Sequence, residues 1–264
     1  MRKARFPRRA IAAAFCVAVL LPLAAHAAET RGAAALFSAG EYQAAIAAGE
    51  ASGNAEGLTA GAGAALADAT LRDAPCLPCF NRAHALASRA IAADPSRPRA
   101  YVYLTVAIGY EARIAGRLAA LRAGYTQESK DAVETALTLA PNDPWVLATA
   151  GGWHIELVRA AGSLLAGLMY GARLDEGIAT FKRALAADPS DATLQVNYAL
   201  SLSSAAFAPM RAEIRAALAA AGQAPARDAY DAAMKARAAL LLDLLDRNED
   251  AAFLALVHRY WAIP

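Results

Sequence analysis

The stretch Ala184-Leu185-Ala186-Ala187-Asp188-Pro189-Ser190 is the last of three similar helix endings in the chain. The earlier ones are Ala90-Ile91-Ala92-Ala93-Asp94-Pro95-Ser96 and Ala136-Leu137-Thr138-Leu139-Ala140-Pro141-Asn142. In each, Ala stands five residues before Pro, Ile or Leu four before it, and a small polar residue after it. Each helix has to end there, because the proline ring pushes the preceding residue out of the α-helical region. The sequence therefore predicts one structural unit repeated along the chain.

Small residues recur on both sides of each proline, with the spacing of an α-helix. The small residues Ala83, Ser129 and Gly177 stand twelve before the prolines, and the apolar residues Ala87, Val133 and Phe181 stand eight before them. In the helices that follow the prolines, the small positions are Thr105, Gly151 and Ala199. This pattern predicts paired helices that pack closely.

The pattern resembles the tetratricopeptide repeat, in which a small residue, an apolar residue, Ala and Pro follow one another at the same spacing. The resemblance implies helical hairpins stacked into an α-solenoid. A weaker copy begins the mature chain at residues 36–46, with Gly40-Glu41-Tyr42 as the turn between its helices.

The units are longer than those of the family. Pro95, Pro141 and Pro189 are 46 and 48 residues apart, against about 34 in the standard repeat. The extra residues fall at 112–124 and 159–171, where we expect lengthened first helices or an added helical turn. A generic helical repeat of less regular curvature is the alternative.

After Pro209 the pattern changes to three predicted closing helices, Met210–Ala221, Ala226–Asp246 and Glu249–Trp261. The last carries apolar residues on one face, which suits a helix that covers the end of a stack. The expected fold is all-α: TPR-like helical hairpins with lengthened units and C-terminal closing helices, in one domain over residues 28–264.

The segment Trp153-His154-Ile155-Glu156, followed by Tyr170-Gly171-Ala172, is similar to the regulator of microtubule dynamics family and its bacterial relatives. That resemblance implies a helical-repeat protein without established catalysis.

Residues 1–27 have the pattern of an export signal. Five basic residues, from Arg2 to Arg9, precede an apolar run, and Ala25-His26-Ala27 supplies a small-x-small cleavage site. Removing this segment leaves 21 Lys and Arg against 24 Asp and Glu, so the formal charge changes from +2 to −3. We therefore expect a periplasmic or secreted protein that does not bind nucleic acid. The most apolar remaining stretch, residues 160–172, is too short to span a membrane.

Cys76-Leu77-Pro78-Cys79 holds the only two cysteines after residue 27, which in an exported chain favours a disulfide. The repeat register puts the pair at the turn between paired helices, so a structural disulfide is the main hypothesis. The spacing also matches thioredoxin-type redox sites, which leaves an exchanging disulfide open, and a metal ligand is a third reading.

No catalytic motif, metal site or cofactor site is predicted. His154 and Glu156 lie two residues apart on a predicted helix, which places them on different faces. We expect His154 to be partly buried and hydrogen-bonded between helices. The chain has no phosphate loop, dinucleotide-binding glycine pattern or nucleophile elbow.

Aromatic residues gather on the helices that follow each proline, which in tetratricopeptide stacks face the concave surface. The candidate binding residues there are Tyr101, Tyr103, Tyr110, Trp153, Tyr170 and Tyr198, with Trp145 beside them. Arg113, Arg117 and Arg122 are expected at a basic edge or a solvated helix face.

The function expected from these features is a non-enzymatic scaffold that binds a protein or peptide partner in the cell envelope. The alternatives are a transport-accessory or small-solute-binding module, and a thiol-disulfide protein that uses Cys76 and Cys79.

Overall fold

The computed structural model describes residues 32–263, which form thirteen α-helices and no strand. The predicted export signal, residues 1–27, lies outside the described residues. The predicted all-α helical-repeat class is confirmed. In chain order, the helices are α2 (Ala33–Ser38), α3 (Tyr42–Ser52), α4 (Ala55–Leu71), α5 (Leu77–Ala93), α6 (Pro98–Ala115), α7 (Arg117–Arg122), α8 (Tyr125–Leu139), α9 (Pro144–Ala161), α10 (Ser163–Tyr170), α11 (Leu174–Ala187), α12 (Ala192–Gln223), α13 (Ala229–Asp246) and α14 (Asp250–Tyr260).

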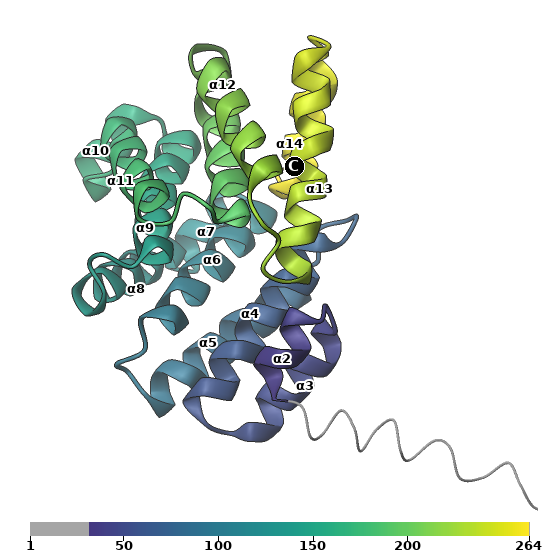
Figure 1. Ribbon diagram of the computed structural model, residues 1–264. Helices are drawn as coiled ribbons and strands as arrows, with labels where there is room; N and C mark the ends of the chain where they lie inside the picture. The colour runs from purple at the N-terminus through teal and green to yellow at the C-terminus, as the bar shows by residue number, and fades with distance from the viewer. Residues whose placement is uncertain (1–31, 264) are drawn as a thin grey trace, which may run out of the picture. The chain divides into compact units, whose positions relative to one another are not determined.

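The helices follow one another as packed pairs, in the order that the colours of Figure 1 trace. The three helix endings quoted above close α5, α8 and α11. These pack against α4, α6 and α9 respectively. The weak first copy is also a pair, because α2 and α3 are joined at Gly40, whose φ of 78° favours glycine.

The predicted close approach of helices is present between α9 and α11. A Cβ on Gly151 would lie 2.7 Å from the carbonyl oxygen of Gly177, and a Cβ on Gly177 would lie 2.9 Å from the carbonyl oxygen of Gly151. Phe181 packs into the same contact, because its backbone nitrogen would lie 2.7 Å from the added Gly151 Cβ. Only glycine at both positions allows the two backbones to lie this close.

The extra residues of the long units form two short helices, α7 and α10. Each follows a glycine at positive φ, Gly116 at 82° and Gly162 at 80°, where the preceding helix ends. The chain therefore turns and adds a separate helix between the members of a pair, which is the added helical segment expected from the spacing.

The closing helices differ from the prediction at their start. Residues 210–221 continue α12 beyond a kink at Ala206, whose φ of −153° is not helical. The kink lies three residues before Pro209, because proline donates no backbone hydrogen bond and its ring clashes with the carbonyl four residues earlier.

The sequence predicts α13 as a closing helix of the stack. In the structure, α13 also contacts the beginning of the described chain. Tyr230 lies 6.3 Å from the ring centre of Phe37 in α2, and its hydroxyl lies 3.0 Å from the Thr70 hydroxyl in α4. The Arg237 guanidinium donates to the Thr70 carbonyl at 2.7 Å. These contacts join the last helices to the first ones, so the inner face of the stack is partly enclosed.

None of the helices in residues 32–263 is long and apolar enough to cross a membrane.

Candidate ligand cavity

A cavity of about 1140 Å³ lies on the inner side of α4, α6, α9 and α12. The short helices α7 and α10 and the segment after α14 contribute to its wall as well. Its lining is dominated by aliphatic and aromatic side chains. The aromatic ones are Phe37, Tyr103, Tyr110, Tyr125, Trp145, Trp153, Tyr170, Phe181, Tyr230 and Trp261.

The structure brings four of the six candidate binding residues together in this wall. These are Tyr103, Tyr110, Trp153 and Tyr170, and Trp145 joins them.

Tyr101 and Tyr198, the other two candidates, lie outside this cavity wall. Tyr101 is two positions from Tyr103 on α6, so it faces away from the cavity, and its hydroxyl donates to the Pro95 carbonyl at 3.1 Å. Tyr198 is buried in the core of α11 and α12, where it packs on Phe181 and donates to Glu213.

Neighbouring helices fix the orientation of the lining rings. Tyr103 packs on Gly63 of α4, where an added Cβ would lie 2.9 Å from its hydroxyl oxygen. Trp153 Nε1 donates to the Ser129 hydroxyl of α8 at 3.1 Å. Trp145 Nε1 donates to the Asp191 carboxylate at the start of α12, also at 3.1 Å. Three lining rings are therefore held in place without any ligand.

A buried charge cluster forms part of the wall. Arg113 is only 8% exposed, and its Nη1 lies 3.4 Å from a Glu156 carboxylate oxygen. Arg159 binds the same carboxylate through two nitrogens, at 2.6 and 3.0 Å. Burial raises the pKa of Glu156, but the two guanidinium groups outweigh it, and the net shift is downward. Two cations therefore share one carboxylate, and the expectation of a solvated helix face is wrong for Arg113.

The Arg113 guanidinium also packs against two aromatic rings. Its carbon is 4.2 Å from the ring centre of Tyr110 and 4.8 Å from that of Trp261. Tyr110 in turn stacks on Phe80 at 4.4 Å, with the rings within 3° of parallel. Such cation–π contacts stabilise a charged group that has little water around it.

Hydrogen bonds and an ion pair also connect wall residues at the starts of α12 and α13. The Asp191 side chain caps α12 through the Leu194 amide at 2.8 Å and lies 3.3 Å from Arg227. Thr193 donates to the Asp231 carboxylate of α13 at 2.6 Å.

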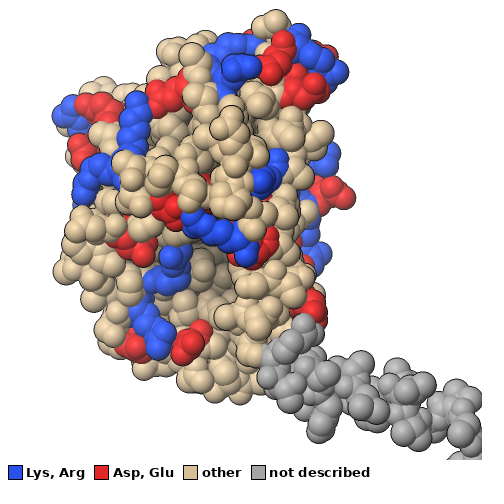
Figure 2. All heavy atoms as spheres, viewed as in Figure 1, with Lys and Arg blue, Asp and Glu red and all other residues tan. Residues whose placement is uncertain are grey.

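On the face shown in Figure 2, acidic and basic side chains are interspersed, and neither sign forms a continuous patch.

His154 has the role expected from its position. Its Nδ1 accepts the Arg173 amide at 3.2 Å, and its Cβ lies against Gly177. Burial lowers the pKa of His154, so the neutral ring is favoured at this acceptor position. Glu156 lies in the cavity wall, whereas His154 does not line the cavity. In residues 32–263, no group of three His, Cys, Asp or Glu side chains is arranged to hold a metal ion.

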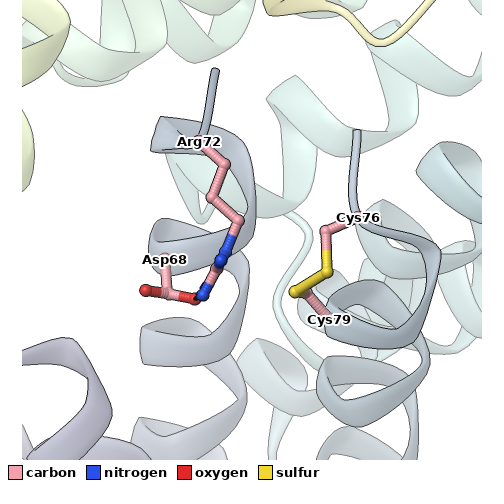
Figure 3. Close-up of a disulfide and its surroundings, with 4 residues drawn as sticks. All are labelled: Asp68, Arg72, Cys76 and Cys79. Atoms are coloured by element: carbon pink, nitrogen blue, oxygen red, sulfur yellow. Dashed lines mark hydrogen bonds and ion pairs between the residues drawn. A yellow bond between two sulfur atoms is a disulfide. The ribbon is translucent and has the colours of Figure 1, made fainter. Parts of the chain in front are cut away.

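Cys76 and Cys79 form a disulfide with an S–S distance of 1.95 Å. Figure 3 shows the bond at the start of α5, beside the Arg72–Asp68 ion pair that ends α4. Cys76 is the residue before α5 begins, so the disulfide closes the first turn of that helix. The predicted position, at the turn between paired helices, is confirmed.

The sequence did not point to three cavity residues from the first and last helices, Phe37, Tyr230 and Trp261, and it pointed to Arg113 only as part of a basic edge or a solvated face. Arg113 falls three residues after Tyr110, on the same helix face, and this spacing was the one local signal.

No model of a known protein family matches this chain, and no curated protein is significantly similar to it.

Proposed function

We propose that this chain is an exported, non-enzymatic, TPR-like binding protein that holds a small apolar molecule in the cavity between its inner helices. The observation that carries the proposal is the cavity of about 1140 Å³ with its mainly apolar lining. Ligand sites in proteins are concave, largely apolar and preformed, with volumes of about 300–1,000 Å³.

Two features favour a small molecule over an extended protein segment as the occupant. The contacts of Tyr230 with Phe37 and Thr70 join the two ends of the stack, which narrows access to the inner face. The rings of Tyr103, Trp145 and Trp153 are fixed by other helices, so the site is organised before a ligand arrives.

A cavity-filling variant tests the proposal. Gly152 of α9 lines the cavity, and a Cβ there would meet only the Phe181 ring, at 3.9 Å. Gly152→Leu therefore places a bulky side chain in the cavity with little disturbance of the helix. Gly222→Leu is the matched control, because a Cβ on Gly222 meets nothing within 4 Å and this residue is outside the cavity wall.

The measurement is mass spectrometry of small molecules extracted from residues 28–264 purified without detergent. Wild type and Gly222→Leu are expected to release the same apolar compounds, and Gly152→Leu far less of them. Equal amounts from all three proteins, or none from wild type, contradict the proposal.

A protein partner is the second candidate, favoured by two leucines on the inserted helix α10. Leu164 and Leu168 are 78% and 77% exposed, and neither lines the cavity. Contiguous exposed apolar surface is typical of interaction sites. Pull-down from envelope extract with wild type, but not with Leu164→Gln/Leu168→Gln, supports this candidate, and identical recovery by both proteins contradicts it.

A further inference from the structure

We infer that the molecule held in this cavity is a neutral amphiphile, with an apolar body and a hydroxyl or amide group that forms hydrogen bonds with Asn197 of α12. This inference rests on the proposed function and assigns the chemical class of its ligand.

Asn197 presents an unused amide to the cavity. The residues of α12 that line the wall are Thr193, Leu194, Asn197 and Ser201, a spacing that places them on one face of the helix. Thr193 already donates to Asp231. Asn197 is partly exposed, its polar atoms are accessible, and its side chain has no hydrogen-bond partner in the described part of the chain. The amide is therefore open to a ligand in the cavity.

Ser201 extends this polar strip by one helical turn. It lies four residues after Asn197 in the same wall, and its hydroxyl also has no partner among residues 32–263. Ser203, two residues further on, faces away from the wall, and its hydroxyl donates to the Ala199 carbonyl at 2.6 Å. The unpartnered groups of this stretch thus lie on the cavity face of α12.

An open amide in an apolar wall selects for a ligand that can pair with it. Water satisfies such a group until a ligand displaces it. A pure hydrocarbon that covers Asn197 leaves the amide unpaired, which weakens binding, whereas a hydroxyl or amide group replaces the lost hydrogen bonds. An asparagine side chain offers two donors and one acceptor, so it is best matched by a group that both donates and accepts.

The surroundings of Asn197 favour a neutral group. The cavity-facing residues of α12 carry no charge, and α9, which packs on α12, adds Ala148, Thr149 and Gly152 to the wall. A formal charge buried against these residues would lack an opposite charge. The wall as a whole is also nearly balanced, because five arginines face four carboxylates: Arg99, Arg113, Arg117, Arg159 and Arg227 against Glu156, Asp191, Asp228 and Asp231.

Tryptophan fluorescence reports on the cavity, because all three tryptophans of the chain, Trp145, Trp153 and Trp261, line it. The probes are bromodecane, ω-bromodecanol and ω-bromodecanoate, which carry the same quenching bromine and differ in the polar group. We expect quenching by bromodecane and ω-bromodecanol. The ionised carboxylate is expected to bind at least about tenfold more weakly than the alcohol.

Two variants locate the polar group of the ligand. Asn197→Leu removes the amide and keeps a side chain in the wall, so the ratio of alcohol to bromodecane affinity is expected to fall about tenfold. Ser201→Ala is expected to lower the same ratio about threefold. Ser203→Ala is its matched control, because Ser203 is bonded within the helix and lies outside the wall, and it should leave the ratio unchanged.

Three results overturn the inference while the proposed apolar site stands. They are an unchanged affinity ratio in Asn197→Leu, equal changes in Ser201→Ala and Ser203→Ala, and a carboxylate bound as tightly as the alcohol. Bromodecane binding by Asn197→Leu shows that the variant keeps its fold and its cavity. Absence of quenching of the wild type by both bromodecane and ω-bromodecanol overturns the inference and the proposed function together.

Discussion

Gly151 of α9 and Gly177 of α11 face each other so closely that neither position has room for a methyl group. An added Cβ would lie 2.7 Å from backbone atoms in one case and 2.9 Å in the other. We expect Gly151→Ala to lower the free energy of unfolding by about 1–3 kcal/mol, because overpacking forces two backbones apart. Chemical unfolding in urea measures this change.

The neighbouring Gly152→Ala is the control for that substitution. Its Cβ makes only an ordinary contact, with Phe181 at 3.9 Å, and alanine is favoured over glycine in a helix by about 1 kcal/mol. Gly152→Ala is therefore expected to be neutral or stabilising. A Gly151→Ala protein as stable as Gly152→Ala would show that the glycine contact does not limit the packing.

Glu156 is predicted to matter more for stability than an exposed carboxylate does. Glu156→Gln leaves Arg113 buried without its carboxylate partner, and breaking a buried pair from one side costs about 3–5 kcal/mol. The double variant Arg113→Met/Glu156→Gln removes the buried cation as well and should recover part of the loss. The comparison is by thermal and urea unfolding, and a double variant no more stable than Glu156→Gln contradicts this view of the pair.

His84 of α5 gives a prediction about pH. Its Nδ1 lies 3.0 Å from the buried Glu111 carboxylate of α6, and its Nε2 lies 3.2 Å from Glu128 of α8, near Tyr125. The Glu111 hydrogen bond raises the pKa of His84, with Glu128 adding to the effect against burial. Because the pKa of His84 is higher in the folded state, the interaction stabilises the fold fully at pH values below the pKa of His84 in the unfolded chain, about 6.5. This stabilisation is lost as the pH rises through the pKa of His84 in the folded state.

The check compares wild type with His84→Gln in urea unfolding at about pH 5 and about pH 9. The wild-type advantage is expected to be larger at the lower pH. A difference between the two proteins that does not change with pH contradicts the assignment.

The disulfide is predicted to be structural, with a small effect because it closes a loop of only a few residues. The chain-entropy relation gives about 2 kcal/mol for Cys76→Ser/Cys79→Ser. The reduction potential of the wild-type pair is expected below about −300 mV, measured on residues 28–264, which contain no other cysteine. A reduction potential of about −200 mV would instead favour an exchanging disulfide.

The sequence predicted the parts of the fold that depend on local rules. The turns at Pro95, Pro141 and Pro189 follow from the geometry of proline, and the Gly151–Gly177 contact follows from the register of small residues. The disulfide turn follows from the same register. These features are decided within a few residues or within one helix pair.

The cavity could be predicted only in part, because its wall is assembled from distant segments. Helix periodicity placed Tyr103 and Trp153 on the inner face, but neighbouring positions on the same helices point elsewhere, as Tyr101 does. Arg113 is buried because the segment after α14 brings Trp261 over it. No local pattern indicates a contact between α6 and the C-terminal end of the described chain.

The central claim is that the cavity binds a small apolar ligand, and ligand-dependent thermal unfolding tests it most directly. With dodecanol at about 100 times its dissociation constant, wild type should gain about 2.7 kcal/mol, a rise in melting temperature of about 5–10 °C for a domain of this size. Gly152→Leu, whose side chain projects into the cavity and takes up part of the space for the ligand, should gain clearly less. No rise in wild type, or the same rise in both proteins, would contradict binding in this cavity.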